Sequence, residues 1–139
     1  MRVMALVKAS PMSEAGQFPA DAMEKLLADM GRYNEELVSA GIMVSGEGLK
    51  PSEFGVRVRF SGNERAETNG PFAESRELVA GFWIWNVKSM DEAIERVKKC
   101  PNPMPDDSDI EICPFVEFED FGEALTPEIQ AREEALRGE

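Results

Sequence analysis

Residues 78–99, LVAGFWIWNVKSMDEAIERVKK, place a strand directly before a helix. In the expected strand Leu78–Val87, Trp83 and Trp85 fall on one side of the extended chain and Phe82 falls on the other. Because large apolar side chains lie on both sides, both faces of this strand must be covered. The capping-box sequence SMDE then begins a helix, which ends after two lysines.

The N-terminal part of the chain repeats this order of strand and helix. Arg2–Lys8 is a short apolar run that predicts a buried strand. Ala20–Ala40 predicts a helix with one apolar face, because its apolar residues recur at steps of three and four. Pro19 begins this helix and Gly41 ends it, and Ile42–Gly46 then predicts a second strand.

A hairpin is expected between the two strand and helix units. Val56–Phe60 alternates apolar and basic residues with period two, and the turn sequence SGN sends the chain back from Glu64. Arg57 and Arg59 are expected to pair across the hairpin with Glu64 or Glu67. Such pairs are ordinary surface chemistry.

The last expected strand, Asp109–Phe118, carries Ile110, Ile112 and Val116 on one face. The order strand, helix, strand, hairpin, strand, helix, strand predicts one α+β domain over residues 1–118. Its arrangement is ferredoxin-like, with an antiparallel sheet, both helices on one face and the hairpin as an insertion. The other face needs a cover, and a dimer in which two such faces meet would bury both tryptophans.

Residues 119–139 form a separate C-terminal extension in this interpretation. Thr126 caps a helix that reaches about Arg137. Only Ile129 and Leu136 share one face of it, so the helix is weakly amphipathic. We expect an added element or a contact with a partner.

The composition restricts the partners. The chain of 139 residues has a net charge of −12 and is 42% hydrophobic, which is typical of one globular domain. Because so acidic a surface repels phosphate backbones and anionic lipids, we expect neither nucleic acid nor a membrane as partner. No apolar run approaches the roughly 20 residues that span a bilayer, and Lys8 stands where a cleavage site would be, so we expect a cytoplasmic protein.

The absence of histidine restricts the chemistry, because histidine is the commonest metal ligand and neutral-pH general base. Cys100 and Cys113 lack the spacing of zinc or redox motifs, so we expect free thiols. The acidic run Asp106–Glu111 lacks the glycine and glutamate positions of a calcium loop. Residues 46–48, GEG, lack the third glycine of a dinucleotide fingerprint, and we expect these glycines to let the strand end and turn. We therefore expect no metal and no cofactor.

Three segments resemble a known family: Val44–Leu49 (VSGEGL), Asn69–Glu77 (NGPFAESRE) and Gly81–Ile84 (GFWI). Together they resemble the YCII-related family, in particular the branch named for its Asp-Gly-Pro-Phe motif. The similarity extends from Met1 to about Phe115. The resemblance implies a dimeric ferredoxin-like α/β barrel, and hence a homodimer.

The resemblance says less about activity. Some members of the broader family are proposed enzymes because they carry a His-Asp pair in a cleft, and this chain has no histidine. Its motif begins with Asn69 in place of the aspartate, so both members of the pair are missing. Ser75 in place of threonine and Arg76 in place of lysine are milder departures, although arginine favours a bidentate contact with a carboxylate or phosphate.

The motif allows two interpretations. In the first it is a rigid connector that follows the turn at Asn69, with Phe72 in the core and with Glu74 and Arg76 against the partner subunit. In the second, these two residues and Glu47 surround a cleft that binds a small organic molecule. If the segment is extended, Glu74 and Arg76 share a face.

The cleft interpretation assigns a role to each residue. Glu47 and Glu74 are the candidate catalytic carboxylates, because a glutamate in an apolar pocket has a pKa raised toward neutrality and can transfer protons without histidine. The residues expected to bind the molecule are Asn69, Phe72, Arg76 and Trp83. The alternatives are a non-catalytic binding or regulatory module and a structural dimer whose terminal helix contacts a partner.

Overall fold

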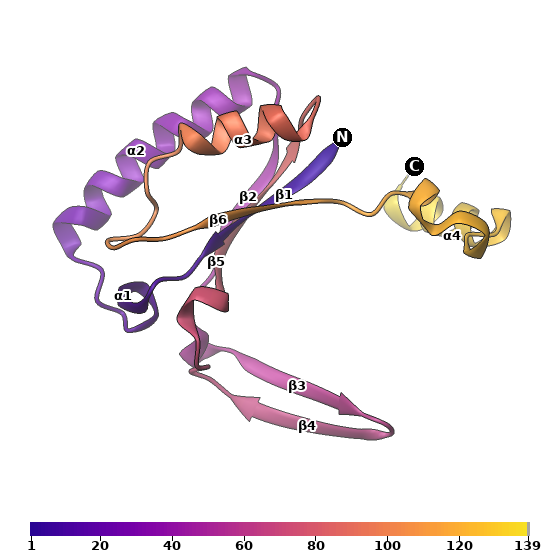
Figure 1. Ribbon diagram of the computed structural model, residues 1–139, viewed down its shortest axis with the longest axis horizontal. Helices are drawn as coiled ribbons and strands as arrows, with labels where there is room; N and C mark the ends of the chain where they lie inside the picture. Colours follow the sequence, from indigo (N-terminus) through magenta and orange to yellow (C-terminus); the bar gives the residue numbers. More distant parts are fainter. Residues whose placement is uncertain (139) are drawn as a thin grey trace.

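The computed structural model describes residues 1–138. Its main sheet has four strands, and helices cover one side of it (Figure 1). The strand order is β2-β5-β1-β6, and all neighbouring strands are antiparallel. The strands are β1 (Arg2–Lys8), β2 (Met43–Gly48), β5 (Val79–Asn86) and β6 (Ile110–Pro114), and the helices are α2 (Ala20–Ser39) and α3 (Met90–Lys98). This arrangement is ferredoxin-like, so the predicted α+β fold class is confirmed.

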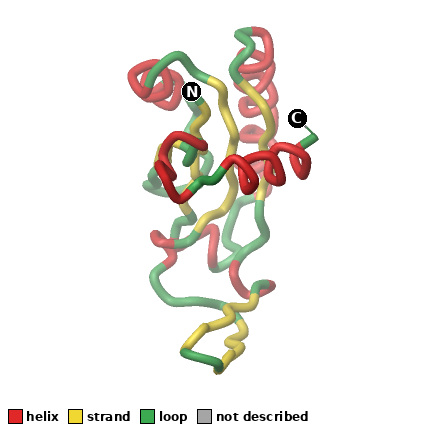
Figure 2. The backbone as a smooth tube through the Cα atoms, turned by 90° about the vertical axis from the view of Figure 1, so that its right-hand side faces the viewer, coloured by secondary structure: helices red, strands yellow, loops and turns green. Residues whose placement is uncertain are grey.

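The other elements lie at the periphery of this sheet. They are α1 (Pro11–Glu14), the hairpin strands β3 (Val56–Ser61) and β4 (Glu64–Asn69), three short 3-10 helices (Ser52–Phe54, Ser75–Glu77 and Phe118–Ala124) and α4 (Pro127–Arg137). The hairpin forms its own two-stranded sheet and is inserted in the sequence between β2 and β5. Figure 2 shows that it extends beyond one end of the four-stranded sheet.

The core lies between the sheet and helices α2 and α3. In the register of β1 with β5, Val3 faces Trp85 and Ala5 faces Trp83, and all four side chains are buried in one cluster with Tyr33 of α2. The expectation that a second copy buries the two tryptophans is therefore wrong. They lie on the face that the chain's own helices cover, because they share that face with the small buried residues of β1.

The opposite face of the sheet carries the alternate residues of each strand, whose side chains point away from the core. Met4 pairs with Ile84 and Leu6 pairs with Phe82, and all four side chains are half-buried. In Figure 1 both α2 and α3 lie on the other side of the sheet. We call this surface the open face.

Most predicted boundaries hold within two residues, but the last strand is shorter than expected. Helix α2 ends at Ser39 and is followed by Gly41 with a positive φ of 72°, the conformation that favours glycine. Strand β6 ends at Pro114, and Val116 lies beyond it with 59% of its surface exposed. The prediction that Val116 shares one face of this strand with Ile110 and Ile112 is therefore wrong.

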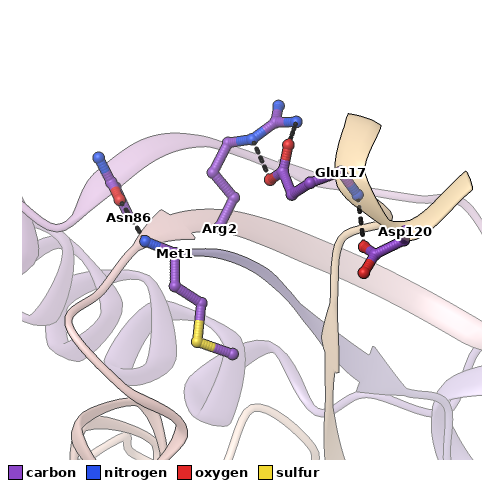
Figure 3. A network of polar contacts seen from close by, with 5 residues as sticks. All are labelled: Met1, Arg2, Asn86, Glu117 and Asp120. Atoms are coloured by element: carbon purple, nitrogen blue, oxygen red, sulfur yellow. Dashed lines mark hydrogen bonds and ion pairs between the residues drawn. The ribbon is translucent and has the colours of Figure 1, made fainter. Parts of the chain in front are cut away.

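The segment after β6 is held to the sheet through Arg2. Arg2 donates hydrogen bonds to both carboxylate oxygens of Glu117, at 3.2 Å and 3.1 Å, as Figure 3 shows. The backbone N–H of Glu117 in turn donates to Asp120 at 2.8 Å. Beyond this point α4 lies apart from the sheet (Figure 1). No helix within residues 1–138 is both long and apolar enough to span a membrane.

Candidate functional site

A cavity of about 620 Å³ lies between the N-terminal half of α2 and the end of the sheet at which the hairpin is inserted. We call it the α2 cavity. Helix α2, strands β2 and β5, and the loops before α2 and β6 contribute its walls. The apolar side chains that line it include Phe18, Met23, Leu26, Met30, Trp83 and Met104.

Trp83 forms a fixed part of this wall. Its indole N–H donates a hydrogen bond to Asn34 of α2 at 2.9 Å, and its ring meets Tyr33 edge-on with 5.8 Å between ring centres. On the neighbouring strand, Gly46 lies so close that a Cβ there would stand 2.6 Å from the indole Cδ1. The hydrogen bond to Asn34, the contact with Tyr33 and the close approach of Gly46 thus fix the position of the indole.

Few charged groups line the cavity, and one of them is already paired. The carboxylate of Glu14 accepts hydrogen bonds from the backbone N–H and the hydroxyl of Ser52, both at 2.6 Å. Glu47 and Lys50 also line the cavity and are exposed. The charged groups at the cavity are therefore exposed or already paired, while most of the remaining wall is apolar.

The structure places two of the six predicted site residues at this cavity. Glu47 and Trp83 line it. Glu47 is exposed on strand β2, where it pairs with Phe82, and alternation places its side chain on the open face. The predicted residues that are absent from the lining are Asn69, Phe72, Glu74 and Arg76.

These four residues belong to the hairpin's return strand and to the segment 70–78, which we call the connector because it joins the hairpin to β5. Asn69, Glu74 and Arg76 are exposed, and Phe72 is half-buried. Glu74 has a positive φ of 60°, and a short 3-10 helix follows it. The connector is not extended here, so the expected shared face of Glu74 and Arg76 does not form.

The start of the connector is fixed by a backbone hydrogen bond and by a hydrogen bond to a serine hydroxyl. The N–H of Gly70 donates to the carbonyl of Gly55 at 2.9 Å, and the N–H of Phe72 donates to the hydroxyl of Ser52 at 2.9 Å. Since that hydroxyl also donates to Glu14, one chain of hydrogen bonds links the motif to the cavity wall. The motif therefore reaches the cavity indirectly.

The aromatic residue of the motif packs on the hairpin. The guanidinium of Arg57 lies 4.1 Å from the centre of the Phe72 ring. Within residues 1–138, no ion pair joins Arg57 or Arg59 to Glu64 or Glu67, so the expected cross-strand pairing is not observed. The register explains this, because Arg57 pairs with Thr68, and Arg59 pairs with an alanine.

The end of the connector is fixed by a buried lysine. Lys8 is the last residue of β1, and its ammonium donates to the carbonyl of Glu77 at 3.1 Å. It also forms an ion pair with Glu111 of β6 at 3.2 Å. Together with Ser52, Lys8 ties both ends of the connector to the domain.

Glu14 and Ser52 were not predicted, because no helix is expected between the strand Arg2–Lys8 and Pro19. The structure forms the short helix α1 there, with Ser10 accepting a hydrogen bond from Ser13 and Pro11 in the first turn. The serine followed by proline was a usable signal for a helix start. Nothing in the sequence pairs Glu14 with Ser52.

Two titratable groups lie near the C-terminal end of α3. Burial raises the pKa of Tyr33, whose hydroxyl donates to the carbonyl of Arg96 at 2.5 Å. Burial also raises the pKa of the Cys100 thiol to about 12. Cys100 and Cys113 are free, and within residues 1–138 no group of three or more Cys, Asp or Glu side chains could hold a metal ion.

Comparison with known proteins matches the fold described above. The YCII-related domain family matches residues 1–118, which include the sheet, the hairpin and every residue that lines the α2 cavity. An uncharacterized protein of Rhizobium meliloti (strain 1021) is 28% identical over 92 residues, which cover 66% of this chain and 74% of the relative. The chain therefore belongs to the YCII-related domain family.

Proposed function

We propose that this YCII-related protein binds a small, mostly apolar organic molecule in the α2 cavity. The observation that carries the proposal is the held indole of Trp83 in a cavity of about 620 Å³. Ligand pockets of proteins typically measure about 300–1,000 Å³, with apolar walls and a few polar groups. A planar or branched apolar molecule would gain burial against Leu26 and Met30, and a polar group on it would face Lys50.

The protein is proposed to act as a homodimer that joins two open faces. Met4, Leu6, Phe82 and Ile84 form a continuous apolar strip there, and a second copy would remove it from water. Size-exclusion chromatography with light scattering at micromolar concentration tests this. A single-chain mass would contradict it.

Acid-base chemistry without a cofactor is the finer form of the proposal. Glu47 is the one predicted carboxylate among the residues that line the cavity, but alternation places its side chain on the open face, so this role requires a bound molecule that reaches that face. Four other predicted site residues lie outside the cavity of their own chain, so they would contribute only at the α2 cavity of a second subunit. They are Asn69, Phe72, Glu74 and Arg76. The alternative is a binding or regulatory module on the same cavity.

The binding proposal is tested with the fluorescent anion 1-anilinonaphthalene-8-sulfonate, which brightens in apolar sites. We expect saturable binding by the native protein and its loss in Leu26→Trp, because the larger ring fills the cavity. Val38→Trp is the matched control, since Val38 lies on the same helix, is 62% exposed and does not line the cavity.

Equal dye binding by both variants would contradict the proposal. Glu47→Gln keeps the shape of the side chain and is expected to bind the dye normally. If Glu47 acts as a base, the same variant loses exchange of carbon-bound protons of a bound 1,3-diketone into D₂O. Unchanged exchange would remove Glu47 from that role.

A further inference from the structure

One polar side chain interrupts the apolar face that α2 presents to the cavity. The residues of this helix that line the α2 cavity are Met23, Leu26, Leu27, Met30 and Asn34. Their spacing of three and four residues places them on one face of the helix. Asn34 is half-buried and lies one turn beyond Met30, beside Trp83. A polar group at such a position is unfavourable unless it has hydrogen-bond partners.

The indole of Trp83 fixes the direction in which the Asn34 amide points. An amide side chain has an acceptor oxygen and a nitrogen with two donor hydrogens, whereas an indole N–H can only donate. The hydrogen bond of 2.9 Å between the two side chains therefore belongs to the amide oxygen. Within residues 1–138 no group accepts a hydrogen bond from the amide nitrogen. Its two N–H groups are therefore available to a ligand.

The other uncharged side-chain donors at the cavity are already used. The hydroxyl of Ser13 donates to the carbonyl of Ser10 at 3.1 Å, and the indole N–H of Trp83 donates to Asn34. In the described part of the chain, Lys50 is the one cationic residue of the lining, and it is exposed beyond the end of β2. A ligand that packs against Trp83 thus meets one free neutral side-chain donor, the amide of Asn34.

The neighbouring tryptophan shows that a buried indole in this fold does not require such an acceptor. The indole N–H of Trp85 is buried, and no acceptor among the described residues reaches it. Trp83 and Trp85 lie on the same face of β5, and of the two only Trp83 lines the cavity. The amide therefore accompanies the indole that a ligand would contact and not the indole in the core.

We propose that the amide nitrogen of Asn34 donates a hydrogen bond to an uncharged oxygen of the ligand, so that the α2 cavity takes apolar molecules that carry a carbonyl group. The inference rests on the proposed binding function and adds the chemical class of the ligand. A planar molecule packed against the Trp83 ring would bring its carbonyl oxygen beside the amide. A charged oxygen is disfavoured there, because burying a charge away from its counter-ion is costly and Lys50 is exposed beyond β2.

The test compares two probes that differ only at the proposed acceptor. They are 2-acetylnaphthalene and 2-isopropenylnaphthalene, in which a CH₂ group replaces the carbonyl oxygen. Equilibrium dialysis gives the Kd of each probe, and the ratio of the ketone Kd to the hydrocarbon Kd is then compared between variants. Because both probes fill the same space, the ratio removes changes in apolar packing.

Asn34→Asp keeps an acceptor oxygen for the indole and replaces the amide donor with a second oxygen. We expect the ratio to rise at least about tenfold, because the ketone loses a hydrogen bond and faces a carboxylate. Ala28→Asp adds the same charge at an exposed position of α2 outside the cavity lining, and is expected to change the ratio by less than about twofold. Equal ratios in the native protein and Asn34→Asp, or equal rises in both variants, would overturn the inference.

Asn34→Leu removes the donor without adding charge, and it decides the result if Asn34→Asp folds poorly. Its ratio is expected to rise about fivefold. A larger rise in Lys50→Met than in the Asn34 variants would place the oxygen at Lys50 and overturn the inference. If the native protein binds neither the fluorescent anion nor the probes, the binding proposal fails together with this one. Dye binding without ketone binding, or with unchanged ratios in the Asn34 variants, would overturn this inference alone.

Discussion

At the scale of single residues, Gly46 on the edge strand β2 explains how the indole of Trp83 on the neighbouring strand β5 can form the cavity wall. The sequence suggested only that the glycines of residues 46–48 let the strand end and turn. In the structure β2 continues to Gly48, and Gly46 faces Trp83 across the strand pair. The absence of a side chain at this position is what the indole requires.

Gly46→Ala is therefore expected to destabilise the protein by about 1–3 kcal/mol, since the new Cβ would stand 2.6 Å from a ring that Asn34 holds in place. Gly48→Ala is the matched control on the same strand, because a Cβ there meets nothing within 4 Å. Its effect is expected to stay within about 0.5 kcal/mol. Urea unfolding measures both, and equal losses would contradict the steric explanation.

At the scale of elements, the motif NGPFAESRE acts through its backbone more than through its charged side chains. Gly70 lies against the turn at Ser52, and a Cβ at Gly70 would stand 1.7 Å from the Ser52 carbonyl oxygen. A rigid connector, the first of the two interpretations, describes this geometry, but its placement of Phe72 in the core is wrong, because Phe72 is half-buried and packs against Arg57 of the hairpin. The proposed contacts of Glu74 and Arg76 with a partner or ligand remain predictions.

Gly70→Ala is expected to separate the connector from the turn, because a clash with backbone cannot be relieved by rotating a side chain. Amide hydrogen exchange in the hairpin, residues 56–69, is expected to rise at least about tenfold. Gly55→Ala, whose Cβ would meet only ordinary contacts at 3.4 Å and beyond, is expected to leave exchange nearly unchanged. Faster exchange in both variants would contradict a specific role for Gly70.

The sequence predicted the elements well where periodicity or capping was strong. Ser89 and Thr126 accept the helix-capping hydrogen bonds expected at the starts of α3 and α4. Helix α1 was missed because four residues are too short to show a period. The α2 cavity could not be predicted either, because its walls meet only after α2 crosses the sheet.

At the scale of the whole molecule, the ion pair of Arg2 with Glu117 joins the sheet to the acidic C-terminal segment, residues 117–138. Hydrogen bonds from Arg2 lower the pKa of Glu117 below its ordinary value of 4.5, and the charge of Arg137 adds to this effect. Because the pKa of Glu117 is lower in the folded protein, the ion pair stabilises the attachment of the C-terminal segment to the sheet above pH 4.5. The stabilisation is lost as the pH falls through the lowered pKa.

Carboxyl NMR titration measures this directly. Arg2→Gln is expected to return the titration midpoint of Glu117 toward 4.5 and to release the segment from the sheet. Arg137→Gln removes a charge without removing the hydrogen bonds, so a smaller upward shift is expected. An unchanged midpoint in Arg2→Gln would show that the pair does not hold in solution.

The backbone hydrogen bond between Gly70 and Gly55 closes the hairpin where it leaves the domain, and this affects how related sequences can diverge. The chain leaves and re-enters the domain at one place, where the N–H of Gly70 meets the carbonyl of Gly55 at 2.9 Å. Residues can thus be gained or lost at the Gly62 tip without shifting the register of the four central strands. Evolution can rebuild this outer arm while the α2 cavity stays the same.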